Sequence, residues 1–256
     1  MDNDGTVHSA AKRIRRKLIL TVLACLGVSA CSLSGSQPIG FQDRVNVGER
    51  MLASGEYESA YRLLGEVTQD NDSKADAHLS VADAYLRGDA FFKARNAFHQ
   101  AIEKGATTVG QVGLGRVALA QNDPDTAVAK FDSVLAVDPA NQAALNGRGV
   151  AFDLRGEHQL AIAEYHKVLE INPTNLDALN NLALSHTIGG LGHEAVAILQ
   201  DLTQSELTDT NLRHNLAIAY YIVGRQQAGY TLATVDMSRA KAEQTFDAVR
   251  RYRASR

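Results

Sequence analysis

The sequence has 256 residues, of which 45% are hydrophobic and 21% charged, so the chain can bury a sizeable core in one or two domains. A formal net charge of −3 gives no positive field for phosphates and argues against nucleic acid as a partner. Two cysteines cannot form a disulfide framework, and the lack of tryptophan, with only 6% aromatic residues, favours helices over many strands.

The first thirty residues have the order of charges and apolar residues that is typical of an export signal. A basic cluster at 12–17 precedes an apolar run of about eleven residues, Leu18–Val28, which is too short to span a bilayer comfortably. The run ends in Val28-Ser29-Ala30-Cys31, which resembles the bacterial lipobox, where a signal peptidase cuts before a cysteine that receives lipid. We therefore expect residues 1–30 to be a lipoprotein signal peptide and Cys31 to carry the lipid.

Two alternatives to this assignment stay open. The segment is an ordinary secretory signal or uncleaved anchor in one of them, and in the other the cut precedes Cys25, which leaves a shorter apolar run. Ser32 in place of aspartate after Cys31 resembles the default for outer-membrane sorting in proteobacteria, which implies a lipid anchor on the periplasmic face of the outer membrane. Residues 31–40, rich in serine and glycine, are expected to be a flexible tether.

A pattern with a period of about 34 residues follows the tether and indicates a repeat protein. Its clearest copies are Gly115-x-x-Ala118-x-x-x-Asn122-x-x-x-x-Ala127-x-x-x-Phe131-x-x-Val134-x-x-x-x-Pro139 and Gly149-x-x-Phe152-x-x-x-Gly156-x-x-x-x-Ala161-x-x-x-Tyr165-x-x-Val168-x-x-x-x-Pro173. The pattern resembles the tetratricopeptide repeat (TPR) motif in its small, aromatic and proline positions. We expect an all-α TPR superhelical solenoid of about six helix-turn-helix repeats over residues 41–237, starting near 41, 75, 108, 142, 176 and 210.

The physical roles of these positions support the same architecture. Small residues such as Gly115 and Gly149 allow the first helix of a hairpin to approach the second closely. Proline at the end of a copy stops the second helix. Four residues at the hairpin turns suit left-handed backbone: Gly55, Asn122, Gly156 and Gly190. Stacked hairpins then share one continuous core.

The segment 238–256 is expected to be a C-terminal capping helix. Ala242, Phe246, Val249 and Tyr252 fall on one face and arginines on the other, and a helix with a polar outer face closes a repeat stack. The preceding second helix, of the sixth repeat, is weakly defined because glycine stands at 229 where alanine is usual.

The sequence carries no pattern for catalysis, for a cofactor or for a metal. It contains no HExxH, paired-cysteine or calcium-loop spacing and no Gly-x-Ser-x-Gly elbow. Gly110, Gly113 and Gly115 follow no predicted strand, so we interpret them as close packing within the third repeat. A non-enzymatic protein without cofactor, metal or small-molecule substrate is expected.

The TPR resemblance implies a binding groove along the first helices, and applying the family's groove positions to the fourth, fifth and sixth repeats selects its lining. The predicted peptide- or protein-binding residues are Asn146, Val150, Asp153, Asn180, Asn181, Leu184, Ile188, Asn211, His214, Asn215, Ile218, Tyr221 and Ile222. Asparagine both donates and accepts, so these asparagines can hold a peptide backbone, while the apolar members serve as anchors. The alternative is that the asparagines only cap or solvate helices. Asp76, Asp83 and Arg87 in the second repeat are interpreted as a solvated charged rim.

The combination of lipobox, tether, repeats and terminal helix resembles the TPR lipoproteins of the tight-adherence (Tad, or Flp) pilus system, the TadD family. The residues that carry this resemblance are the run 211–219, Gly224-Arg225 and Asp236-Met237-Ser238. It implies a scaffold that helps the pilus secretin or another Tad component to assemble or localise. TPR pilotins of type IV pili, and envelope adaptors for cell-wall hydrolases or protein quality control, are the alternatives.

Overall fold

A computed structural model describes residues 40–200 and 209–254 of the chain, and the expected signal peptide, the lipidation site Cys31 and most of the tether lie outside these ranges. The described residues form thirteen helices and no strand. The helices are α2 (Phe41–Ala53), α3 (Tyr57–Asp70), α4 (Ala75–Arg87), α5 (Phe91–Glu103), α6 (Thr107–Ala120), α7 (Pro124–Leu135), α8 (Gln142–Leu154), α9 (His158–Ile171), α10 (Leu176–Ile188), α11 (Gly192–Gln200), α12 (Thr210–Ile222), α13 (Gln226–Ala233) and α14 (Arg239–Ala254).

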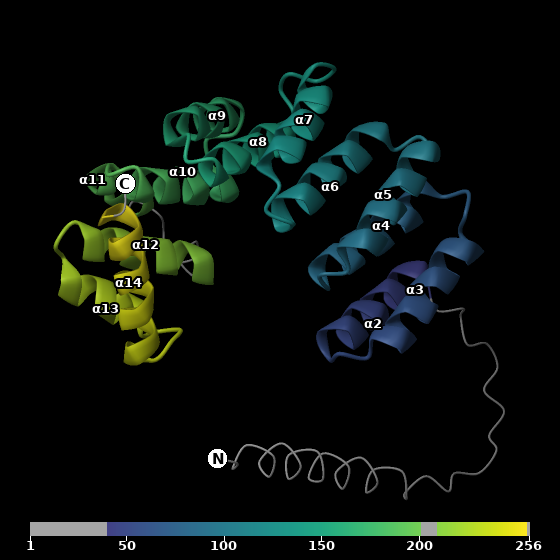
Figure 1. The fold of residues 1–256 in the computed structure, drawn as a ribbon, viewed down its shortest axis with the longest axis horizontal. Coiled ribbons are helices and arrows are strands. Elements are labelled where there is room, and N and C mark those ends of the chain that lie inside the picture. Colours follow the sequence, from purple (N-terminus) through teal and green to yellow (C-terminus); the bar gives the residue numbers. More distant parts are fainter. Residues whose placement is uncertain (1–39, 201–208, 255–256) are drawn as a thin grey trace, which may run out of the picture. The chain divides into compact units, whose positions relative to one another are not determined.

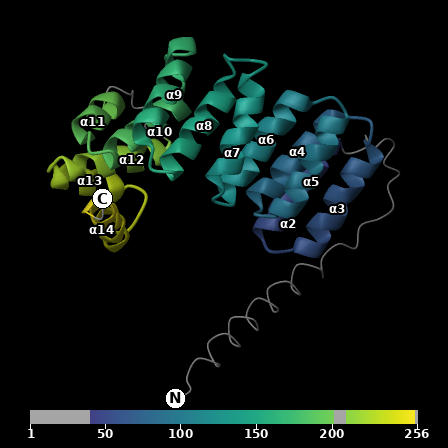
Figure 2. The same cartoon turned by 45° about the horizontal axis from the view of Figure 1, so that its top comes forward.

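Consecutive helices pair into six hairpins, α2/α3 to α12/α13, and each hairpin packs on the next (Figures 1 and 2). The first helices begin at 41, 75, 107, 142, 176 and 210, within one residue of the expected repeat starts. The predicted all-α TPR superhelix is therefore confirmed. We call the surface formed by α2, α4, α6, α8, α10 and α12 the first-helix face.

Small residues set the close approach within each hairpin. A Cβ atom on Gly149 would lie 2.5 Å from the Tyr165 ring, and one on Gly115 would lie 2.6 Å from the Phe131 ring. Both rings come from the second helix of the same hairpin and are fully buried. Gly110 and Gly113 face Ile102 and the Phe98 ring on α5, the second helix of the preceding hairpin. The glycine cluster therefore allows close packing, as predicted, but only Gly115 packs within the third repeat.

The turns and helix ends follow the sequence signals. The four predicted turn residues have positive φ: Gly55 at 81°, Asn122 at 56°, Gly156 at 76° and Gly190 at 96°. Side chains of Asp123, Asn141, Asn175 and Asp209 cap the helices that follow them by accepting hydrogen bonds from backbone N–H groups. Local residues thus set these turns and helix starts, both within hairpins and between them.

The terminal helix α14 packs on α12 and α13 at the end of the stack (Figures 1 and 2). Ala242 and Phe246 are buried in this contact, and Val249 packs against the same cluster, as predicted. The side chain of Tyr252 lies outside the described part of the structure.

Candidate functional site

Paired asparagines connect successive first helices in the C-terminal half of the first-helix face. Asn181 on α10 donates a hydrogen bond of 3.1 Å from Nδ2 to Oδ1 of Asn146 on α8. Asn215 on α12 donates one of 2.7 Å to Oδ1 of Asn180 on α10. In each pair the two residues are 35 positions apart, one more than the repeat period, so the sixth position of one repeat meets the fifth of the repeat before it. We call these two pairs the asparagine rungs.

The rungs leave hydrogen-bonding groups unused. Each donating amide keeps a second N–H and its oxygen, and each accepting amide keeps both N–H groups. Among the described residues none of these groups has a side-chain partner, and all four asparagines are only half-buried. Because the rung bonds hold the amides in place, a ligand that binds there has fewer side chains to order.

Ion pairs take the place of the rungs in the N-terminal half of the same face. Arg87 on α4 pairs with Glu49 on α2, and Arg116 on α6 donates a hydrogen bond of 2.8 Å to Asp83 on α4. Pairs as exposed as these contribute little to stability. Two of the three second-repeat charges predicted to be a solvated rim, Asp83 and Arg87, are thus paired with neighbouring repeats, and the third, Asp76, is exposed.

Asp153 is not a groove residue, which corrects one member of the predicted set. Its Oδ1 accepts hydrogen bonds from His158 Nδ1 at 2.7 Å and Ser185 Oγ at 2.8 Å, and its Oδ2 accepts one from the Tyr165 hydroxyl at 2.8 Å. Ser185 and Tyr165 are fully buried. The carboxylate therefore joins α8, α9 and α10 inside the stack, and burial beside it raises the pKa of Tyr165 well above its usual value.

Ile218 and Tyr221 are also not free anchors, because α14 covers them. The Tyr221 ring stacks on Phe246 with centroids 4.4 Å apart and meets the Tyr230 ring edge-on at 5.9 Å. Ile218 is buried in the same cluster, against which Ile222 also packs. Sequence reasoning assigned these residues to the groove because it did not place the terminal helix over them.

The other predicted groove residues keep partial or full exposure on α8, α10 and α12. They are Val150, Leu184, Ile188, His214 and Asn211. Of these, His214 lies near the last loop, with Nε2 3.5 Å from Oδ2 of Asp236.

The loop before α14 is tied to α12 by Asp236. Arg213 donates two hydrogen bonds to its carboxylate, from Nε at 2.8 Å and from Nη2 at 2.6 Å. These hydrogen bonds, more than any other cause, hold the pKa of Asp236 below its ordinary value. Arg213 and Asp236 both belong to the residues on which the TadD resemblance depends, and their contact positions the cap.

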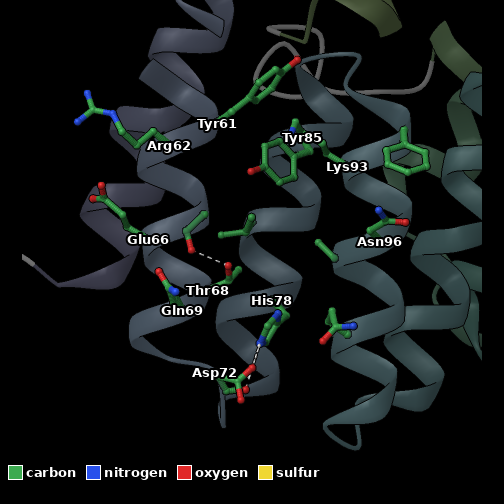
Figure 3. Close-up of a pocket in the computed structure, with 15 residues that line it drawn as sticks. Tyr61, Arg62, Glu66, Thr68, Gln69, Asp72, His78, Tyr85, Lys93 and Asn96 are labelled. Carbon is green, nitrogen blue, oxygen red and sulfur yellow. Dashed lines mark hydrogen bonds and ion pairs between the residues drawn. The ribbon is translucent and has the colours of Figure 1, made fainter. Parts of the chain in front are cut away.

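A pocket that the sequence analysis did not predict opens between the second helices α3 and α5 (Figure 3). Its volume is about 710 Å³, and we call it the outer pocket. Its lining includes Tyr61, Gly65, Val81, Tyr85 and Lys93. The sequence signal that could have indicated it is Gly65, a glycine in the middle of α3. It stands at no position where the repeat motif calls for a small residue.

Two kinds of site are not found in the described ranges. No helix there has both the length and the apolar character needed to cross a membrane. Within the same ranges no group of three or more histidine, cysteine, aspartate or glutamate side chains is placed to hold a metal ion.

Comparison with known proteins supports the repeat assignment. Residues 112–175, which span most of α6 to α9, match the family described as Tetratricopeptide repeat. No curated protein sequence matches the chain significantly.

Solved structures of similar fold include PilW, described as a widely conserved type IV pilus biogenesis factor. It has 20% identity and a TM-score of 0.59, with 77% of this chain and 91% of PilW covered. A thermophilic TPR protein of Thermus thermophilus has 20% identity and a TM-score of 0.60, with 71% and 100% covered. A tetratricopeptide repeat protein of Parabacteroides merdae has 16% identity and a TM-score of 0.58, with 84% and 89% covered.

The fold is therefore a TPR-type superhelical solenoid, and the match to the Tetratricopeptide repeat family covers residues 112–175 of it. Identities this low establish a shared fold and no more.

Proposed function

We propose that this protein is a non-catalytic, lipid-anchored TPR scaffold that holds a segment of a protein partner against its first-helix face during Tad/Flp pilus biogenesis. The observation that carries the binding part is the pair of asparagine rungs. Their amides are already oriented and keep free donors and acceptors, which suits recognition of a polypeptide backbone. Leu184 and Ile188, partly exposed on the same helix as Asn180 and Asn181, supply apolar contact beside them.

The location and the pilus system rest on other observations. The lipobox-like run ending at Cys31 supports anchoring at the periplasmic face of the outer membrane, and the segment 211–238 supports the Tad assignment through its resemblance to the TadD family. An anchor raises the effective concentration of the scaffold near membrane partners, so a weak binding face is sufficient. The proposed partners are the pilus secretin or other Tad components.

A role in type IV pilus assembly is the second candidate, favoured by the fold similarity to PilW over 91% of that protein. The two candidates differ in the partner that is recovered.

The test is mild crosslinking of the tagged protein in its own envelope membranes, followed by identification of the captured proteins. A Tad secretin or platform protein is expected, with less captured by Cys31→Ala because the lipid is lost. Capture of type IV pilus proteins would favour the second candidate, and capture of cell-wall enzymes alone would refute both.

The binding face is tested separately on the recovered partner. Asn181→Ala combined with Asn215→Ala should weaken binding about tenfold or more, because one amide of each rung is lost. Gln159→Ala with Gln226→Ala, which removes two exposed amides from the second helices α9 and α13, is the matched control. Unchanged affinity of the rung variant, with a normal helical spectrum, would exclude the first-helix face.

A further inference from the structure

The outer pocket has an apolar floor and a size suited to one large side chain and its neighbours. Val81 and Tyr85 on α4 and Ala97 on α5 are buried and form its base. Its volume of about 710 Å³ is within the range of about 300–1,000 Å³ that is usual for ligand pockets. It lies between second helices, so it is separate from the first-helix face.

The carboxylates in its lining are already neutralised by cations. Arg44 reaches Glu66 with Nη2 at 3.4 Å, and Lys104 donates a hydrogen bond of 2.8 Å to Oδ2 of Asp72. At this end of the pocket Asp72 also lies beside His78 (Figure 3). Each acidic group in the lining thus already has a cationic partner.

The cations in the lining differ from the carboxylates in having no ion-pair partner among the described residues. In the described part of the chain, neither Arg62 nor Lys93 has a carboxylate partner. Lys93 Nζ instead lies over aromatic rings, 4.4 Å from the centroid of Tyr61 and 5.9 Å from that of Tyr85. Figure 3 places Tyr61, Tyr85 and Lys93 together at the end of the pocket away from Asp72, with Arg62 on the outer side of α3 at the same end. The charge left without a partner in the pocket is thus positive.

Gly65 keeps the wall of the pocket open. It lies in the middle of α3 and is exposed, and a Cβ atom built there would meet nothing within 4 Å. Alanine is a better helix former than glycine, so neither packing nor helix stability calls for glycine here. Because Gly65 lines the pocket, the missing side chain leaves this part of the lining open.

We propose that the outer pocket is a second binding site, which takes an acidic peptide segment of a partner protein that carries one large apolar side chain. The apolar side chain lies on Val81 and Tyr85 beside Gly65, and the peptide's carboxylates bind Lys93 and Arg62. The amides of Gln69, Asn96 and Gln100 line the pocket and can bond to the peptide backbone. The charge of the unpaired cations selects an acidic segment, and the buried floor selects an apolar side chain within it.

The test uses fluorescence anisotropy with a labelled, end-blocked probe peptide, Glu-Asp-Glu-Phe-Asp-Glu, and the protein purified in detergent from cells that make it. Gly65→Phe fills the pocket and should weaken binding about tenfold or more. Arg62→Glu with Lys93→Glu should also weaken it about tenfold or more, since two charge-assisted contacts are lost. Lys241→Glu with Arg251→Glu on α14, a double reversal of equal charge, should leave the affinity unchanged.

Two probe controls make the result independent of the variants' folding. A peptide with lysine in place of every acidic residue, and one with alanine in place of phenylalanine, should each bind the unaltered protein at least about tenfold more weakly. Equal binding of either control peptide, or full binding by a folded Gly65→Phe variant, would overturn the proposal. The rung variant Asn181→Ala with Asn215→Ala should bind the probe normally, which separates this site from the first-helix face.

Discussion

Arg213 holds Asp236 through two hydrogen bonds, of 2.8 and 2.6 Å, and so fastens the loop before α14 to the last first helix. Because Arg213 lowers the pKa of Asp236, the folded state binds this proton less readily than the unfolded state does. The resulting stability is present above the ordinary aspartate pKa of about 4 and is lost as the pH falls through the lower folded-state value.

The first prediction follows from the lowered pKa of Asp236 in the folded state. The melting temperature of the unaltered protein should fall more steeply between about pH 4 and pH 2 than that of Asp236→Asn, which has no proton to take up. Thermal unfolding by circular dichroism in a series of buffers measures this. Identical slopes for the two proteins would show that the contact does not stabilise the cap.

The buried carboxylate of Asp153 provides a second prediction. Asp153→Ala leaves the buried Tyr165 hydroxyl without its acceptor and the Ser185 hydroxyl with only the His158 carbonyl oxygen at 3.4 Å, and it should lower the free energy of unfolding by ~3 kcal/mol. Asp125→Ala is the control, because that side chain is 84% exposed and its ion pair with Arg155 should contribute less than ~0.5 kcal/mol. Urea unfolding of both variants gives the comparison, and similar losses would contradict the network.

Replacing each of two helix-interior glycines by alanine should change the stability of the protein in opposite directions. In Gly149→Ala the new Cβ collides with the buried Tyr165 ring, so the expected cost is about 1–3 kcal/mol. Gly65→Ala adds a Cβ in open space and should stabilise the protein by about 0.5–1 kcal/mol through helix propensity. The midpoints of chemical unfolding decide this, and a destabilised Gly65→Ala would show that the wall of the outer pocket is closed.

The floor of the outer pocket makes the protein sensitive to alkali. Burial, and after it the neighbouring Tyr61, raises the pKa of Tyr85 to about 12. Below the ordinary tyrosine pKa of about 10 this has no effect on stability, and between about pH 10 and 12 stability is lost because only the unfolded state ionises. Tyr85→Phe should therefore lose less stability over this range, as followed by chemical unfolding at pH 9 and pH 11.5. An equal loss in both proteins would contradict the shifted pKa.

The repeat architecture could be predicted from the sequence because its signals are local. Three kinds of residue recur at one period: small residues such as Gly149, turn residues with positive φ such as Gly156, and a terminating proline such as Pro173. Each of these three acts within its own hairpin. The positions of the asparagines also followed from the period. That they bond to one another did not, since the contact joins residues 35 positions apart and depends on how two first helices are offset.

The misassigned residues share a different cause. Asp153 occupies a position that the motif places in the groove, yet Tyr165 and Ser185 from two other helices surround its carboxylate. Tyr221 is covered by the ring of Phe246, which lies 25 residues later in the chain, on a helix that belongs to no repeat. A motif describes the average repeat, and these contacts depend on the individual side chains of neighbouring helices.

The division of the first-helix face into ion pairs and asparagine rungs bears on how a bound chain would be aligned along it. The rungs Asn146–Asn181 and Asn180–Asn215 are equivalent under a shift of one repeat, so a peptide could slide by that distance and meet the same amides. The pairs Glu49–Arg87 and Asp83–Arg116 are not equivalent in this way, because the cation stands at different positions of its repeat. A partner that spans both halves would thus be bound by the asparagine amides and kept in register by the two ion pairs.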